Sequence, residues 1–170
     1  MIELRQSHKD LGRAEYNMLQ GIVDGENGFM NKVYGMTYEE YKLWLIEQDD
    51  HHLGINLPDG WIPDTTYFLY DDNTPIGISR VRHSTNDYLQ KVLGAGEIGY
   101  GISKDYRGKG YGNILFRETL KKCTLFGYDK ITLFPHKDNA ATIKIMLKNG
   151  GKIIGKFKED KVIIEIPTTS

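Results

Sequence analysis

The chain has little of what marks several classes of protein. Its 170 residues contain one cysteine, which excludes a disulfide framework within the chain and a cysteine-rich zinc site. The 22 lysines and arginines nearly balance the 23 aspartates and glutamates, which gives a net charge of −1. This balance argues against a nucleic-acid-binding module, because such modules carry a basic excess. We therefore expect no nucleic-acid partner.

Long apolar runs and metal-binding motifs are also lacking. No stretch approaches the roughly 18 consecutive apolar residues of a membrane-spanning helix. The N-terminal segment from Met1 to Arg5 carries charge where a signal peptide would have its apolar core. There is no HExxH motif, and the adjacent His51 and His52 would have difficulty converging on one ion. We expect a cytoplasmic protein with no membrane partner and no bound metal.

Hydrophobic periodicity and turn residues predict a single α/β domain over residues 1–170 with the order β-α-α-β-β-β-α-β-α-β-β. Strands are expected at 2–5, 65–70, 76–83, 97–103, 130–134, 152–157 and 161–166. Helices are expected at 9–23, 37–48, 110–126 and 139–148. Consecutive strands predict antiparallel neighbours, whereas the strand–helix–strand unit over 97–134 predicts one central parallel pair. The sheet should therefore be mixed and mostly antiparallel.

Glycine is the residue in excess, at 19 of 170, and seven of the 19 lie between Gly94 and Gly112. The densest stretch is Arg107-Gly108-Lys109-Gly110-Tyr111-Gly112, between a predicted strand and a predicted helix. Glycines allow backbone N–H groups to approach a ligand closely, and the N-terminal end of a helix attracts anions. Together with the two cations, this pattern predicts a cradle for a pyrophosphate. A tight glycine-rich turn without a ligand is the alternative.

Two other phosphate-binding motifs do not fit. A P-loop requires a glycine where Ser103 stands and a serine or threonine where Gly110 stands. A GxGxxG pattern does occur at Gly94, Gly96 and Gly99, but it precedes its strand instead of following it. We therefore interpret this pattern as a chance match.

The glycine-rich loop resembles the [Arg/Gln]-x-x-Gly-x-[Gly/Ala] loop of the GNAT N-acetyltransferase superfamily. Asp138 to Ile143, followed by Lys148-Asn149-Gly150-Gly151, resembles the asparagine-bearing helix of that family. The expected order of elements also matches the GNAT (acyl-CoA N-acyltransferase) fold over roughly the whole chain. The segments 65–69, 82–83 and 149–151 further resemble a bacterial branch of predicted acetyltransferases without an assigned substrate.

The resemblance implies acetyl-CoA as co-substrate and a primary amine of a small molecule or peptide as acceptor. It also implies a set of cofactor-binding residues in three groups. Backbone N–H groups would polarise the thioester carbonyl, the glycine-rich loop would hold the pyrophosphate, and the asparagine-bearing helix would contact the pantetheine arm. These groups are, in turn, Tyr100, Gly101 and Ile102; Arg107, Gly108, Lys109, Gly110, Tyr111 and Gly112; and Asn139 and Thr142. A monomer or a homodimer would suit this activity.

Direct attack by a neutral amine requires a group that takes its proton. Glu97 is the first candidate base, because its strand also carries the expected oxyanion donors, and His83 is the second. The alternatives are a solvated strand end for Glu97 and a simple hydrogen-bond partner for His83. Met146 stands where many family members have the tyrosine that protonates the thiolate, so this role falls to Tyr100 or Tyr111, or to no residue.

Two other functions stay open at this point. The loop recognises pyrophosphate and not the acyl group, so another acyl-CoA is a possible donor. The methionine at position 146 also fits a CoA-binding regulatory module without efficient catalysis. Among single residues, Cys123 has helical spacing to apolar neighbours and is expected in the core, whereas Trp61 lies in a long loop and is a candidate to line an acceptor site.

Overall fold

The computed structural model describes residues 1–169 and has the predicted order of strands and α-helices. The strands are β1 (Ile2–Gln6), β2 (Asp64–Asp71), β3 (Thr74–Arg82), β4 (Ile98–Ile102), β5 (Lys130–Leu133), β6 (Lys152–Phe157) and β7 (Lys161–Pro167). The helices are α1 (Arg13–Leu19), α2 (Tyr38–Leu53), α3 (Tyr111–Cys123) and α4 (Ala140–Lys148). Short helical turns lie at η1 (Glu26–Gly28), η2 (Tyr88–Leu93), η3 (Lys104–Tyr106) and η4 (Thr124–Phe126).

The sequence located some helix ends better than others. Helix α2 begins at the capping box of Thr37 and Glu40, as expected, but it runs beyond residue 48 to Gly54, which ends it in the left-handed conformation. Helix α1 is shorter than the expected 9–23, because it begins only after Gly12. The π-helical turn η2 has no counterpart in the sequence prediction.

The strands form two sheets instead of one. Strands β1-β2-β3-β4 make an antiparallel sheet, and β5-β7-β6 make a second one. The expected parallel pair of β4 and β5 is therefore not a hydrogen-bonded ladder in residues 1–169. The side chain of Glu97 replaces one ladder contact, because its Oε2 accepts the backbone N–H of Thr132 at 2.9 Å. The two strands meet at this point, and β4 keeps an unpaired edge beyond it.

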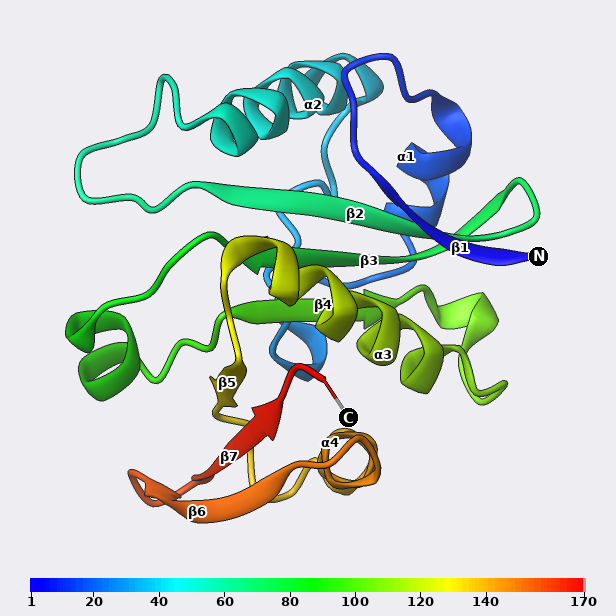
Figure 1. The fold of residues 1–170 in the computed structure, drawn as a ribbon. Coiled ribbons are helices and arrows are strands. Elements are labelled where there is room, and N and C mark those ends of the chain that lie inside the picture. The colour runs from blue at the N-terminus through cyan, green and yellow to red at the C-terminus, as the bar shows by residue number, and fades with distance from the viewer. Residues whose placement is uncertain (170) are drawn as a thin grey trace.

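Helices cover both faces of the larger sheet (Figure 1). Helices α1 and α2 lie on one face, over a buried apolar cluster that includes Leu19, Tyr41, Phe68 and Ile78. Helix α3 lies on the other face, where Phe116 packs with alternate residues of the same strands. The smaller sheet and α4 gather at the opposite end from α2 (Figure 1). Within residues 1–169, no helix has both the length and the apolar character to cross a membrane.

Candidate active site

The glycine-rich loop connects the end of β4 to the start of α3. Gly108 and Gly110 both adopt the left-handed conformation, with φ of 75° and 86°. Gly110 is also the N-cap of α3, and no side-chain hydrogen bond caps the start of this helix within residues 1–169. The backbone N–H groups that begin α3 are therefore available to an anion, with the positive end of the helix dipole behind them.

The two cations of the loop have different surroundings. Nε of Arg107 donates to the carbonyl of Ile102 at 2.9 Å, and its Nη2 donates to the carboxylate of Glu26. Arg107 thus joins the loop to the end of β4 and to η1. Lys109 is exposed and forms no ion pair with any residue from 1 to 169. Lys109 is consequently the cation of the loop that is free to meet a phosphate.

The unpaired edge of β4 runs from the meeting point with β5 toward this loop. The N–H of Ser103 donates to Ile76 on β3 at 3.1 Å. Because successive N–H groups of a strand point to opposite sides, that of Gly101 also points toward β3, whereas those of Tyr100 and Ile102 point to the open edge. Of the three expected oxyanion donors, Tyr100 and Ile102 are therefore placed to meet a ligand, and the N–H of Gly101 is not.

Helix α4 brings the asparagine-bearing segment close to β4. Oδ1 of Asn139 accepts the backbone N–H of Thr142 at 3.2 Å, so this side chain caps the helix. The hydroxyl of Tyr100 is buried and has no hydrogen-bond partner among the described residues. Burial raises the pKa of Tyr100, while nearby Thr142 acts in the opposite direction. Tyr100 and Thr142 thus approach each other from β4 and α4.

Glu97 is buried, with 3% of its surface exposed, which contradicts a solvated strand end. Its Oε1 accepts a hydrogen bond from Gln90 at 3.0 Å, and its Oε2 accepts the N–H of Thr132. Burial raises the pKa of Glu97 above its ordinary value of 4.5, and the hydrogen bonds oppose this shift. The carboxylate lies where β4 and β5 separate, and its oxygens retain lone pairs for further donors.

His83 lies just beyond β3 on the face of α3. Its ring stacks on Phe126 at 4.4 Å between centroids. Its Nε2 lies 2.7 Å from the hydroxyl of Thr65, which in turn lies 2.7 Å from Nδ1 of His52. Burial lowers the pKa of His83, and neighbouring His52 adds to the shift. His83 is thus joined by hydrogen bonds to Thr65 and His52, in a chain that the sequence did not reveal.

Several other expectations concern single side chains. The hydroxyl of Tyr111 donates to Asp71 at 2.6 Å, so it is already engaged. Met146 is 4% exposed in the apolar cluster under α3. Cys123 is buried in the same cluster, as expected, and burial raises the pKa of its thiol to about 12. In the described part of the chain, no group of three histidine, cysteine or acidic side chains is placed to bind a metal.

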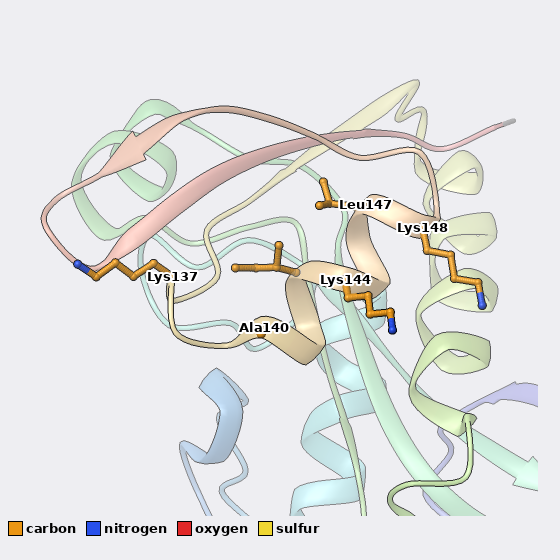
Figure 2. A pocket seen from close by; sticks show the side chains of 6 residues that line it. Lys137, Ala140, Lys144, Leu147 and Lys148 are labelled. Carbon is orange, nitrogen blue, oxygen red and sulfur yellow. The ribbon is translucent and has the colours of Figure 1, made fainter.

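A lysine-rimmed pocket on α4 was not found from the sequence. Its lining consists of Lys137, Ala140, Ile143, Lys144, Leu147 and Lys148. Figure 2 shows Lys144 and Lys148 extending from α4 and Lys137 extending from the loop that precedes it. The spacing of Lys144 and Lys148 by four residues is a signal that could have revealed this cationic face.

Comparisons with known proteins agree with this arrangement. Residues 24–152 match the family model described as the acetyltransferase (GNAT) domain. The chain belongs to the GNAT acetyltransferase family. This is a family of acyltransferases, so the protein is classed as a transferase enzyme, and the family assignment suggested by the loop and the asparagine-bearing helix is confirmed.

Solved structures share the fold at low sequence identity. N-acetyltransferase PseH from Campylobacter jejuni, solved in complex with acetyl coenzyme A, is 16% identical, with a TM-score of 0.64 and 100% coverage of both chains. Ribosomal-protein-S5-alanine acetyltransferase from Vibrio fischeri is 15% identical, with a TM-score of 0.68 and coverage of 99% of this chain and 94% of that one. A chimera of spermidine N-acetyltransferase SpeG from Vibrio cholerae and hSSAT is 16% identical, with a TM-score of 0.65 and coverage of 99% and 96%.

Proposed function

We propose that the chain transfers an acetyl group from acetyl-CoA to a primary amine by direct attack of the amine on the thioester. The observation that supports this most strongly is the continuity of two features. The uncapped start of α3 offers N–H groups to a pyrophosphate, and the unpaired edge of β4 begins directly beside it. An anion with an extended amide-bearing arm, such as coenzyme A, matches both features at once.

The cofactor would follow this path. Gly108, Lys109 and Gly110, with the first turn of α3, would hold the pyrophosphate, and Arg107 would fix the shape of the loop. The pantetheine arm would lie along the open edge of β4 and donate its amide N–H groups to carbonyl groups there, which leaves the N–H groups of Tyr100 and Ile102 for the thioester carbonyl. The lysine-rimmed pocket on α4 would suit the phosphate on the ribose, because three lysines surround an apolar floor.

The reaction needs one bond made, one bond broken and two protons moved. The amine nitrogen bonds to the thioester carbonyl carbon, and the N–H groups of Tyr100 and Ile102 stabilise the oxygen that becomes negative. The carbon–sulfur bond then breaks and the thiolate takes a proton, while the nitrogen, positively charged after the attack, gives its second proton to the group that protonated the thiolate. The hydroxyl of Tyr100 is the proposed donor, since it is buried near Thr142 and has no hydrogen-bond partner in residues 1–169.

Glu97 is the proposed base that takes the proton of the attacking ammonium, directly or through one water. Its position at the junction of β4 and β5 places it at the inner end of the open edge. Burial raises its pKa toward neutral pH, which makes it a better proton acceptor than an ordinary carboxylate. His83 remains the second candidate, because its lowered pKa leaves the ring neutral and able to accept a proton.

Glu97→Gln tests this role. The change keeps the size of the side chain and removes the proton acceptor, so kcat/KM for acetyl transfer should fall about 10²–10⁴-fold at neutral pH and recover partly at high pH. The affinity for acetyl-CoA should change little. Glu15→Gln is the matched control, because Glu15 is also a buried carboxyl, hydrogen-bonded to Tyr70 at 2.9 Å on α1.

The same measurements can show that a residue other than Glu97 is the base. If Glu97→Gln keeps activity within a few-fold while His83→Gln loses it, the histidine is the base. If neither variant alters the pH–rate profile, neither residue is the base.

Thiol release with a panel of amines and of acyl-CoAs tests the donor: acetyl-CoA should turn over fastest. Tight acetyl-CoA binding without thiol release for any amine would favour a regulatory module instead.

The acceptor is proposed only by class. The named relatives act on spermidine and on a ribosomal protein, so both small-molecule and peptide amines belong in the panel. One domain over residues 1–170 would carry the whole reaction, as a monomer or a homodimer.

A further inference from the structure

A half-buried arginine on β3 has a buried nitrogen with no hydrogen-bond partner in residues 1–169. Arg80 is half-buried on the face of the sheet that α1 and α2 cover, and its Nε is buried without a hydrogen bond to any residue from 1 to 169. Its guanidinium lies 5.3 Å from the centre of the Phe29 ring. A buried guanidinium nitrogen without a hydrogen bond is unusual, because loss of hydration costs free energy that a partner normally offsets. The arrangement therefore calls for an anion from outside the chain.

A carboxylate with one buried oxygen that lacks a hydrogen bond lies in the same region. Oδ1 of Asp64 has no hydrogen-bond partner in the described chain, and Nδ1 of His51 lies 3.7 Å from it, too far for a hydrogen bond. Asp64 raises the pKa of Arg80 against the larger lowering effect of burial, so the two groups sense each other's charge. They nevertheless form no ion pair. Two opposite charges are thus held near each other and left unsatisfied.

The pair lies next to the proposed acyl site. Arg80 is directly opposite Gly99 on β4, and directly opposite residues point to the same face of a sheet. A Cβ at position 99 would lie 3.5 Å from the Phe29 ring. Because residue 99 is a glycine, no side chain of its own lies between that ring and the strand. Trp61, which is 49% exposed, lies 5.7 Å from the His51 ring and adds an aromatic surface near Asp64.

We propose that Arg80 and Asp64 bind the acceptor, and that the acceptor is therefore a primary amine that also carries an oxyanion group, a carboxylate or a phosphate. The planar guanidinium takes the oxyanion, for which its fork of N–H donors is suited. The carboxylate of Asp64 takes the ammonium before it is deprotonated. This assignment rests on the proposed acetyltransferase function and narrows its acceptor class.

Arg82 shows the contrast with a structural arginine. It lies two residues along the same strand, and its Nη1 donates to the carbonyl of Gly96. The side chain of Arg82 therefore fixes the segment that leads into β4. Arg80 makes no such contact within residues 1–169, and its sequence position alone gives no reason for the difference.

The test compares acceptors that differ only in the anionic group. The first set shares an alkyl amine: lysine carries a carboxylate, lysinamide a neutral amide, and 1,5-diaminopentane neither. The second set compares phosphoethanolamine, which carries a phosphate, with ethanolamine, which does not. We expect the wild type to prefer the anionic member of one of these sets by about 10-fold or more in kcat/KM. Which set shows the preference identifies the oxyanion.

Arg80→Gln should remove this preference, raising KM for the anionic probe about 10–100-fold and leaving its neutral analogue within a few-fold. Arg80→Lys should keep part of it, because the charge remains and the fork is lost. Arg13→Gln is the control, since Arg13 also stacks on an aromatic ring, 4.1 Å from the centre of Tyr38, but on α1. Asp64→Asn should raise KM for charged and neutral amines alike.

Binding measured by calorimetry in the presence of CoA separates the two proposals. If no amine is acetylated but the anionic probe still binds with an affinity that depends on Arg80, the acceptor site stands and the proposed reaction fails. If neutral amines are acetylated as well as anionic ones, and Arg80→Gln changes neither, the reaction stands and this inference is overturned. Lower stability of Arg80→Gln with unchanged selectivity would likewise make Arg80 a structural residue.

Discussion

Gly110 offers a direct test of the cofactor site, because the folding cost of its backbone conformation can be separated from its effect on cofactor binding. It caps α3 with φ of 86° and ψ of 0°, and a Cβ there would meet no atom of the described chain within 4 Å. Gly110→Ala therefore introduces no clash within the protein. Its effect on folding comes only from the left-handed conformation, which costs a non-glycine residue about 1–2 kcal/mol.

Gly127 provides the matched control. It has φ of 85° and ψ of 10°, it is exposed beyond the other end of α3, and a Cβ there also meets nothing within 4 Å in residues 1–169. The alanine variant also loses less chain entropy on folding, by about 0.4–1 kcal/mol, so each substitution should destabilise by about 1 kcal/mol. For a chain of this length both melting temperatures should fall by about 2–4 °C.

Only Gly110→Ala should weaken acetyl-CoA binding. A methyl group at the start of α3 blocks the approach of the pyrophosphate to one or more backbone N–H groups, and a hydrogen bond to a charged group contributes about 1.5–3 kcal/mol. The dissociation constant measured by calorimetry should therefore rise about 10–100-fold. Equal affinities in the two variants would refute the assignment of this loop to the pyrophosphate, whatever the melting temperatures show.

Three further predictions concern buried groups. Because burial raises the pKa of Glu97, the folded state holds this proton more tightly than the unfolded state, so its contribution to the free energy of unfolding should decrease as pH rises above about 4.5. Denaturant titrations of the wild type and Glu97→Gln should differ in this slope, and parallel curves would contradict the shift. Cys123, with a thiol pKa of about 12, should resist alkylation at pH 8 until the protein unfolds; rapid labelling of native protein would contradict its burial. Met146→Tyr should lower the free energy of unfolding by about 1–3 kcal/mol without raising kcat, because Met146 is packed in an apolar cluster; a higher kcat would show that the new hydroxyl reaches the thiolate.

The fold and the glycine-rich turn before α3 could be predicted because their signals are local. Alternation of apolar residues, the capping box at Thr37 and the glycines near 110 each depend on neighbours in the sequence. Helix α1 was predicted too long because apolar spacing continues on both sides of it, whereas Gly12 and Gly21 decide where it can form. Gly21 packs so closely on Ser103 that a Cβ would lie 1.9 Å from its Oγ, which is a tertiary constraint.

The proposed acceptor site could not be predicted, because its residues meet only in the folded chain. Phe29, Asp64 and Arg80 come from the loop after η1, from β2 and from β3. Nothing in the sequence distinguishes Arg80 from Arg82, although one lacks a hydrogen-bond partner for its buried Nε and the other is fixed to Gly96. The parallel pairing of β4 and β5 was expected from the strand–helix–strand rule, which describes direction and not hydrogen bonding. The rule could not show that the side chain of Glu97 would accept a backbone hydrogen bond from β5 in place of a strand-to-strand hydrogen bond.

In the proposed reaction, strand β4 would bring the cofactor, the acceptor and the core together in one short segment. Its even-numbered residues send side chains toward α3, where Tyr100 packs on Phe116 at 5.4 Å between centroids, and send N–H groups to the open edge. Its glycines, Gly99 and Gly101, send N–H groups to β3 and leave the opposite face without side chains, below Phe29. A larger residue at Gly99 would fill the space beside Arg80 without touching the cofactor edge. The two substrates would therefore approach β4 from different sides, and the acyl group would be reached where the edge and the glycine face adjoin.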